Sequence, residues 1–274
     1  MTISTVMWHM DLEPSTKGCL RVAADLAGQF NAKLIGVAAA DLPWSYLTQE
    51  SATFTLIDAL RSDIGKRLAN AEQRFQSAMA QFAGQVEWRS AIDSPVNYIA
   101  HQARAADLVV VSANRSGKLL DSSIGQLDLG DLAMQAGRPV LIVPPEVGQL
   151  DLKCVLVAWK DTREARRAVN DALPLLRKAQ DVVVAEVIEG ESARSSAHVR
   201  LDDVVGWLGR HGIAASARAF DFPEGRDPVD RLWQYGADLI VAGAYGHSRV
   251  REWVFGGFTD GFLRRSPQCV FLSH

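Results

Sequence analysis

The chain has few of the residues and runs that would place it in a special class of protein. It holds only three cysteines in 274 residues, and Cys19, Cys154 and Cys269 lie far apart in or beside apolar stretches. This pattern favours neither a disulfide framework nor a Cys-x-x-Cys metal site, so we expect buried thiols. No apolar run approaches the roughly 18 residues of a membrane helix, and the chain start lacks the features of a signal peptide. We therefore expect a cytoplasmic protein with no membrane partner.

Charge of one sign is not in excess either. Lys and Arg number 29 against 32 Asp and Glu, which gives a net charge of −3. Proteins that bind nucleic acid usually carry a basic excess, so nucleic acid is not an expected partner. With 48% hydrophobic residues in a chain about twice as long as a typical domain, the sequence predicts a globular protein of one large or two ordinary domains.

Motifs of the common catalytic and metal-binding classes are also missing. No Gly-x-Ser-x-Gly, Ser-x-x-Lys or Gly-x-Gly-x-x-Gly pattern follows an expected strand, and no cluster of His and Cys offers zinc ligands. Ser116-Gly117-Lys118 fails as a phosphate-binding P-loop, because Ser112 and Leu119 stand where a glycine and a Ser or Thr are needed. The sequence therefore indicates no catalytic residue and no metal site.

What the chain has in abundance is an alternation of short apolar runs and longer helical patterns. The runs predict strands at 3–8, 33–39, 85–89, 107–112, 139–143, 154–159, 181–188, 214–220, 238–243 and 268–272. Helices are expected near 16–29, 57–82, 95–105, 126–136, 162–178, 195–210, 228–236 and 257–265. This alternation predicts strand-helix units around a parallel sheet, in the doubly wound α/β class.

The second half of the chain repeats the first. Residues 106–110 (Ala-Asp-Leu-Val-Val) match residues 237–241 (Ala-Asp-Leu-Ile-Val) at an offset of 131 positions. Around the first strand of each half, Trp8 aligns with Trp159 if one insertion is allowed. These matches indicate an internal duplication.

A stretch with two prolines and a glycine, residues 144–150, separates the two halves. Proline and glycine at such a place are typical of a linker. We therefore expect two domains, residues 1–148 and residues 149–274.

The loop after the fourth expected strand of the second half is rich in glycine. Gly243, Gly246 and Gly256 lie between an expected strand and an expected helix. Parallel sheets bind ligands at this end of their strands, glycine lets the backbone approach a phosphate, and the free amides at a helix start attract anions. The loop is therefore a candidate phosphate site. The structural alternative is a tight strand-to-helix connection that needs glycine for its turns alone.

The spacing Gly-x2-Gly-x9-Gly at Gly243, Gly246 and Gly256 resembles the universal stress protein family, and the duplication makes the whole chain similar to its two-domain members. The resemblance implies two tandem doubly wound domains, each a five-stranded parallel sheet of order 3-2-1-4-5 flanked by helices, packed as an intramolecular pseudo-dimer. Two chains pairing again as a homodimer is left open. It also implies a cytoplasmic stress-response protein that binds ATP, or AMP or ADP, with or without Mg²⁺, in its C-terminal domain.

The resemblance further implies which residues bind the nucleotide. Ala158 would line the base pocket, with Val187 and Ile188 at its rim. Lys160, followed by Asp161, stands where the family usually has an acidic residue, and its side chain would either reach the phosphates or block the pocket. The loop residues that would face the phosphates are Gly243, Gly246, His247, Gly256, Gly257, Phe258 and Thr259.

The first half lacks two of the three glycines. Ser112 and Arg115 stand where Gly243 and Gly246 stand in the second half, so we expect no nucleotide in residues 1–148. The leading hypothesis is a protein that acts by regulated interaction, without turnover. Two alternatives stay open: a stress-response scaffold or dimerisation protein that needs no nucleotide, and a slow ATP hydrolase.

Overall fold

The structure, a computed structural model, describes residues 2–12, 17–42, 54–113, 127–188, 190–221, 228–244 and 266–274. The strands are β1 (Thr5–His9), β2 (Lys33–Ala40), β3 (Val86–Ile92), β4 (Leu108–Ser112), β5 (Val140–Val143), β6 (Cys154–Ala158), β7 (Asp181–Ile188), β8 (Ser216–Asp221), β9 (Leu239–Gly243) and β10 (Cys269–Ser273). The α-helices are α1 (Lys17–Phe30), α3 (Phe54–Met79), α4 (Pro95–Gln102), α5 (Leu129–Gln135), α6 (Arg163–Leu176), α7 (Arg194–Arg210) and α8 (Pro228–Trp233), with 3₁₀ turns at Ala103–Ala105 and Glu191–Ala193.

All ten expected strands are confirmed, with ends that differ from the expected ones by at most three residues. The expected helices are confirmed as well, except the one near 257–265, which lies outside the described residues. The apolar stripe of α3 is buried only in its later turns, from Ile64 to Phe75, and the helix start at Phe54 is 90% exposed. None of the described helices has the length and hydropathy of a membrane span.

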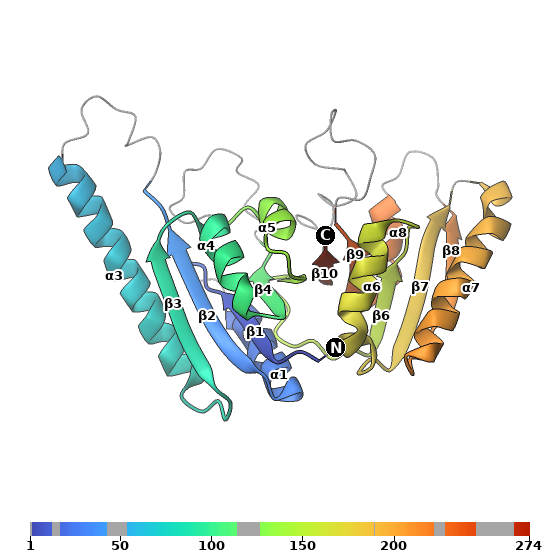
Figure 1. The fold of residues 1–274 in the computed structure, drawn as a ribbon, viewed down its shortest axis with the longest axis horizontal. Coiled ribbons are helices and arrows are strands. Elements are labelled where there is room, and N and C mark those ends of the chain that lie inside the picture. The colour runs from blue at the N-terminus through green and yellow to red at the C-terminus, as the bar shows by residue number, and fades with distance from the viewer. Residues whose placement is uncertain are drawn as a thin grey trace.

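The ten strands form one sheet in the order β3-β2-β1-β4-β5-β10-β9-β6-β7-β8. Within each half all neighbouring strands are parallel, and each half has the predicted order 3-2-1-4-5. The halves meet where β5 pairs with β10 in the antiparallel direction. Figure 1 shows β10 near the middle of the molecule, with β1–β4 on one side and β6–β8 on the other. The predicted fold class, two doubly wound α/β halves, is therefore confirmed.

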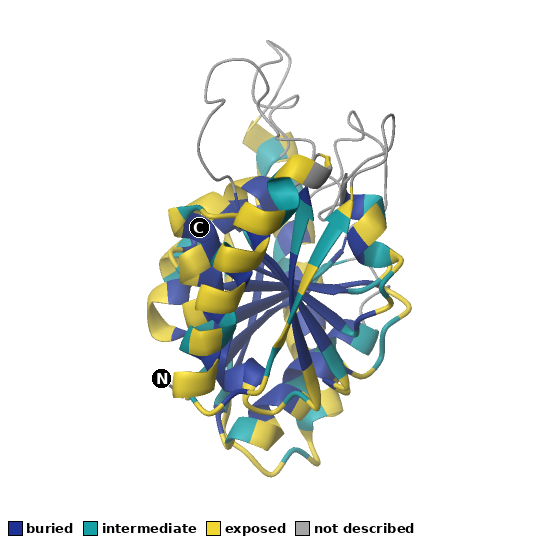
Figure 2. Ribbon diagram, turned by 90° about the vertical axis from the view of Figure 1, so that its right-hand side faces the viewer, coloured by how far each residue is buried: buried dark blue, intermediate teal, exposed yellow. Residues whose placement is uncertain are grey.

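Helices cover both faces of the sheet. The side chains of α1, α3, α6 and α7 pack into one hydrophobic cluster, and those of α4, α5 and α8 pack into a second cluster on the opposite face. Every residue of β5 and β10 is buried, whereas β3 and β8, at the two edges, contain no buried residue. Figure 2 shows this contrast between the dark blue central strands and the outer elements.

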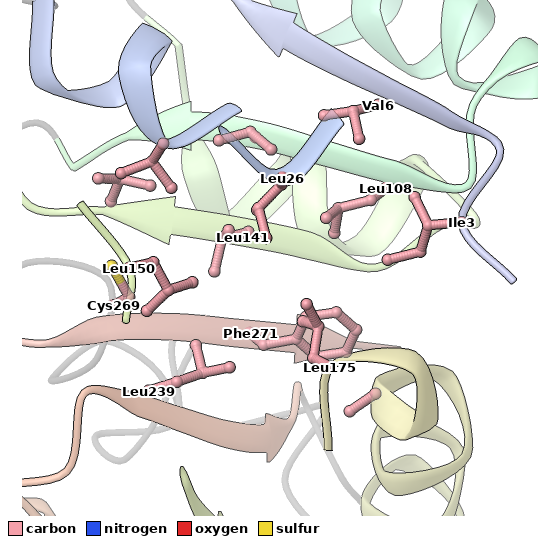
Figure 3. Close-up of a cluster of buried hydrophobic side chains, with 14 of the residues drawn as sticks. Ile3, Val6, Leu26, Leu108, Leu141, Leu150, Leu175, Leu239, Cys269 and Phe271 are labelled. Atoms are coloured by element: carbon pink, nitrogen blue, oxygen red, sulfur yellow. The ribbon is translucent and has the colours of Figure 1, made fainter. Parts of the chain in front are cut away.

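The hydrophobic core continues across the junction of the two halves. Leu141 of β5 lies opposite Phe271 of β10, and both belong to the same cluster as Leu26 of α1 and Leu175 of α6 (Figure 3). Burial of apolar surface therefore holds the halves together in addition to the strand hydrogen bonds. The linker between β5 and β6 spans the expected boundary near residue 148, whose place stays a prediction.

The cysteines follow the expectation in part. Cys19 and Cys269 are buried, and burial raises the pKa of each thiol to about 12. Cys154, at the start of β6, is only partly buried, which corrects the expectation of three buried thiols.

Candidate functional site

The carboxyl ends of β6 and β9 lie side by side where the strand order reverses. β6 has β7 on one side and β9 on the other, which makes this edge the topological switch point of the second half. Ala158, the last residue of β6, pairs with Ala185 of β7 and with Ala242 of β9. All three side chains pack on the face covered by α8. The edge of the sheet therefore carries a row of three small, buried side chains.

Six of the predicted site residues lie at this edge. Val187 and Ile188 end β7, Gly243 ends β9, and Lys160 and Asp161 follow Ala158 with exposed side chains. The other six, Gly246, His247, Gly256, Gly257, Phe258 and Thr259, lie outside the described residues. The described part of the predicted site thus comes together at one end of the sheet, and its role in nucleotide binding stays a prediction.

Gly243 lies directly against the first turn of α6. An ideal Cβ at this glycine would be 2.5 Å from the amide nitrogen of Ala165 and 2.6 Å from the carbonyl carbon of Glu164. Backbone atoms cannot rotate away as side chains can, so any larger residue would push the helix off the strand. Close approach of α6 to β9 therefore requires a glycine at this position, whatever the ligand.

The first turn of α6 is ordered by its own side chains. Thr162 is the N-cap and accepts a hydrogen bond from the amide of Ala165 at 3.3 Å. Asp161 forms an ion pair with Arg166 at 2.5 Å, and both side chains are at least half exposed. Thr162 therefore fixes the start of the helix, whereas the exposed ion pair adds little stability.

Glu164, in the same turn, was not among the predicted site residues. Its side chain is only 1% exposed, and one carboxylate oxygen, Oε1, pairs with the guanidinium of Arg163. Burial alone would raise the pKa of this carboxyl, but hydrogen bonds from Arg163, from the backbone amide of Glu164 and from the Thr162 hydroxyl outweigh burial and lower the pKa. Glu164 is therefore ionised at neutral pH.

The second carboxylate oxygen of Glu164, Oε2, is buried and has no hydrogen-bond partner among the described residues. Such a group in a folded protein calls for an explanation, because an ionised oxygen that loses water without gaining a donor is unfavourable. The sequence carried one signal of this burial: Glu164 stands four and eight positions before the buried Ala168 and Ala172 on the same helix face.

The strand register corrects the predicted match between Trp8 and Trp159. Trp8 pairs with Val110 of β4, and the equivalent residue Val241 of β9 pairs with Val157, so Trp8 corresponds to Val157. No insertion is needed within the strands. The prediction was wrong because it matched two aromatic letters, whereas the ladder hydrogen bonds set the register.

The same register shows what the first half carries at the switch point. His9 corresponds to Ala158 and pairs with Val37 of β2. The amides of Met10 and Trp159 then donate equivalent hydrogen bonds to β2 and β7, so Met10 corresponds to Trp159. The next residues, Asp11 and Lys160, therefore correspond as well. The first half therefore has an acidic residue after its first strand, but larger side chains replace the alanine row.

His9 fills its place as a neutral side chain. It is 5% exposed, and burial lowers its pKa to about 4. In the described parts of the chain, no group of three or more His, Cys, Asp or Glu side chains is arranged to hold a metal ion. The first half thus has a buried histidine where the second half has a buried alanine.

Comparison with known proteins supports the fold over the whole chain. No protein-family model and no curated protein matches. A universal stress protein from Archaeoglobus fulgidus DSM 4304 matches with a TM-score of 0.70 and 18% identity, over 98% of this chain and 97% of its own. A functionally unknown protein from Pseudomonas aeruginosa PAO1 matches with a TM-score of 0.61 and 14% identity, over 99% of this chain and 92% of its own.

A universal stress protein solved in complex with cAMP matches 52% of this chain and 98% of its own, with 24% identity and a TM-score of 0.37. That score is too low to carry an argument about the ligand of this chain. The full-length match, together with the strand order, leads to one conclusion: from end to end, the chain has the fold of a universal stress protein.

Proposed function

We propose that this chain is a two-domain universal stress protein that binds an adenine nucleotide, ATP in the first place, in residues 149–274. The observation that carries the proposal is the row formed by Ala158, Ala185 and Ala242 at the switch point. These alanines are buried, and their small size would let a flat purine ring approach the carboxyl ends of β6 and β9 without meeting a bulky side chain from the strands. The glycine-rich loop that begins at Gly243 would add backbone amides for the phosphates.

Residues 1–148 act as a scaffold in this proposal. His9 and Val37 stand where the second half has the smaller Ala158 and Ala185, and Ser112 and Arg115 replace two of the glycines. The antiparallel pairing of β5 with β10 supports an internal pair of domains as the working unit. The protein would work in the cytoplasm and respond to stress through nucleotide-dependent contact with a partner.

Calorimetric titration tests the proposal. Mg-ATP, ADP, AMP and cAMP are titrated into protein that has been unfolded, freed of any carried nucleotide and refolded. We expect binding of ATP with a stoichiometry near one per chain. Gly256→Glu should weaken it at least about tenfold, since a carboxylate in the loop repels phosphate. Gly125 stands 131 positions earlier, at the equivalent place in the first half, and the matched variant Gly125→Glu should not weaken binding. Two sites per chain would contradict the scaffold role of the first half.

One observation favours a stress-response scaffold that needs no nucleotide. Gly243 is required by the close approach of α6, so its presence does not by itself call for a ligand. This alternative predicts no heat and no thermal shift with Mg-ATP, whereas a ligand at 100 times its Kd would stabilise the fold by about 2.7 kcal/mol. Among the described residues, Asp161, just after the end of β6, does not favour ATP hydrolysis, because its side chain is exposed and paired with Arg166.

A further inference from the structure

The strand β8 forms one outer edge of the sheet. It pairs with β7 and, among the described strands, with no other (Figure 1). No residue of Ser216–Asp221 is buried. The outward N–H and C=O groups of an edge strand can pair with a further strand. An extended segment of another protein can therefore add to the sheet at β8.

Two exposed arginines on one face of this edge are held over aromatic rings. The Cζ atom of Arg218, in β8, lies 5.7 Å from the centroid of the Tyr235 ring, and that of Arg231, in α8, lies 5.4 Å from the centroid of the Phe220 ring. The centroids of the two rings are 5.9 Å apart. Both rings pack against the hydrophobic cluster on the α8 face, so they restrict where the two guanidinium groups lie.

Neither Arg218 nor Arg231 forms an ion pair with any residue that the structure describes. Arg231 donates one hydrogen bond, to Oε1 of Gln234 at 3.3 Å. A guanidinium group has five N–H donors, so most of the donors of this pair remain for an acceptor from outside the described chain.

The first half has an arginine at the equivalent place of its own edge strand. Arg89 of β3 is two strands away from His9 in the register of the sheet, and Arg218 of β8 is two strands away from Ala158. His9 and Ala158 correspond, so Arg89 and Arg218 correspond as well.

The fold uses the charge of Arg89 but not that of Arg218. Arg89 donates to Oε1 of Glu87 at 2.6 Å and to Oε1 of Gln102 at 2.8 Å. The second half has Ser216 where the first has Glu87, so the carboxylate two positions before the arginine is missing. The edge at β8 therefore carries a positive charge that the edge at β3 neutralises.

Charge complementarity selects an acidic segment for β8. Alternate side chains of a strand added to this edge would lie on the same face as Arg218. A segment with Asp or Glu at every second position would therefore bring its carboxylates to Arg218 and Arg231. A second copy of β8 is not suited, because an antiparallel pair about a two-fold axis would bring the two Arg218 side chains close together.

We propose that β8 binds an extended acidic segment of a partner protein, which adds to the edge of the sheet as a further strand and pairs alternate carboxylates with Arg218 and Arg231. Tyr235 lies four positions before β9 begins, so this surface extends towards the amino ends of the strands, away from the proposed nucleotide site. The inference goes beyond the proposed function by naming the chemistry of a partner, and the binding does not require a nucleotide.

Fluorescence anisotropy with the nucleotide-free full chain tests this proposal. The probes are labelled, end-capped peptides: Thr-Glu-Val-Glu-Val-Glu-Thr and the same peptide with Gln in place of Glu. We expect the Glu peptide to bind about fivefold or more tightly than the Gln peptide, since each exposed ion pair adds a modest amount. Alternate residues of a strand turn their N–H groups to the same side, so N-methylation of either the Glu or the Val residues should abolish binding, and N-methylation of the other set should not.

Variants of the arginines separate recognition from a general effect on the fold. Arg218→Gln and Arg231→Gln should each weaken the Glu peptide about twofold or more. The matched variant in the first half, Arg89→Gln, should leave its affinity unchanged. A double variant, Arg218→Glu with Arg231→Glu, should prefer a peptide with Lys in place of Glu, and a purely structural role of the arginines would not give this reversal.

Several results would overturn the proposal. Equal affinity for the Glu and Gln peptides, or no binding of either, excludes recognition of carboxylates. Binding that survives both patterns of N-methylation excludes strand addition, and an equal effect of Arg89→Gln excludes β8 as the place. Tighter binding of an oligouridine probe would assign the arginines to nucleic acid, and self-association that Arg218→Gln abolishes would assign the edge to a second copy.

The outcome is separate from that of the proposed function, because no nucleotide is present in the peptide titrations. If the peptide binds as expected and ATP does not bind, this inference stands and nucleotide binding fails. If ATP binds and the peptide does not, the proposed nucleotide site stands and the acidic partner is wrong.

Discussion

Replacing Gly243 by alanine tests how the carboxyl edge of the second half is built. The new Cβ would lie 2.5 Å from the amide nitrogen of Ala165 and 2.6 Å from the carbonyl carbon of Glu164. Carbon atoms without a bond between them keep well over 3 Å apart, so the first turn of α6 must move. Overpacking of this kind costs about 1–3 kcal/mol, and the lower entropy of the unfolded chain offsets about 0.4–1 kcal/mol of it. We expect a net loss of about 1–2 kcal/mol.

Urea unfolding measures this loss, with the slope of the free energy against urea unchanged between the variant and the wild type. In a thermal scan, each kcal/mol should lower Tm by roughly 2–4 °C. Gly209→Ala is the matched control in the same half, because a Cβ on Gly209 in helix α7 meets nothing within 4 Å. That variant should gain about 0.5–1 kcal/mol, as expected when alanine replaces glycine inside a helix.

A Gly243→Ala variant as stable as the wild type would refute this reasoning. It would mean that α6 does not approach β9 as closely as described, and that Gly243 is free to serve a ligand alone. The equivalent exchange in the first half is Ser112→Gly. Because the end of β4 already accommodates the Ser112 side chain, removing that side chain relieves no clash and should not make the protein more stable.

Two further predictions concern the alanine row and its counterpart. Burial holds the pKa of His9 at about 4, below its usual 6.5. The unfolded chain therefore binds the proton more tightly than the folded protein does. The free energy of unfolding should be at its full value above about pH 6.5 and should fall by up to about 3 kcal/mol towards pH 4. Urea unfolding at pH 7.5 and 4.5 should show a smaller fall for His9→Gln, and equal falls would contradict the assignment. Ala158→His copies the first half into the second and should weaken ATP at least about tenfold in calorimetry, whereas exposed Ala80→His should not; unchanged affinity would place the base elsewhere.

The fold was predictable because the signals that specify it are local. The run of valines at Asp181–Ile188 predicts a buried strand, and the structure has it with the same ends. The exposed start of α3 was not predictable in the same way: the apolar period continues through Ile57 and Leu60, but the sheet that would bury them ends before the helix does. Periodicity shows which side chains share a face and not whether anything covers that face.

The site was predictable only in part, because its decisive contacts join residues far apart in the sequence. Glu164 has the sequence context of an ordinary exposed acid in the first turn of a helix, where negative charge is common. It is buried because Gly243, on a strand much later in the chain, lets α6 come close. The register at His9 likewise follows from hydrogen bonds between strands. The residue types around Trp8 and Trp159 do not determine those hydrogen bonds, so the sequence alone could not predict the register.

The two ends of the strands have diverged to different degrees, which bears on where the function lies. At the amino end, Asp107 accepts a hydrogen bond from the amide of Thr5 at 3.0 Å, and Asp238 accepts the equivalent bond from Cys154 at 2.8 Å. The aspartate therefore makes the same structural hydrogen bond in both halves. At the carboxyl end, by contrast, His9 of the first half corresponds to Ala158 of the second, and Asp11 corresponds to Lys160.

A duplicated fold that needed only to stay folded would have no reason to keep one end matched while the other end differs in size and charge at successive positions. The difference lies at the edge where parallel sheets bind ligands, and it places small side chains there in the second half and larger ones in the first. The halves therefore share one architecture and differ at their carboxyl ends, and the proposed function predicts a ligand at the ends of β6 and β9.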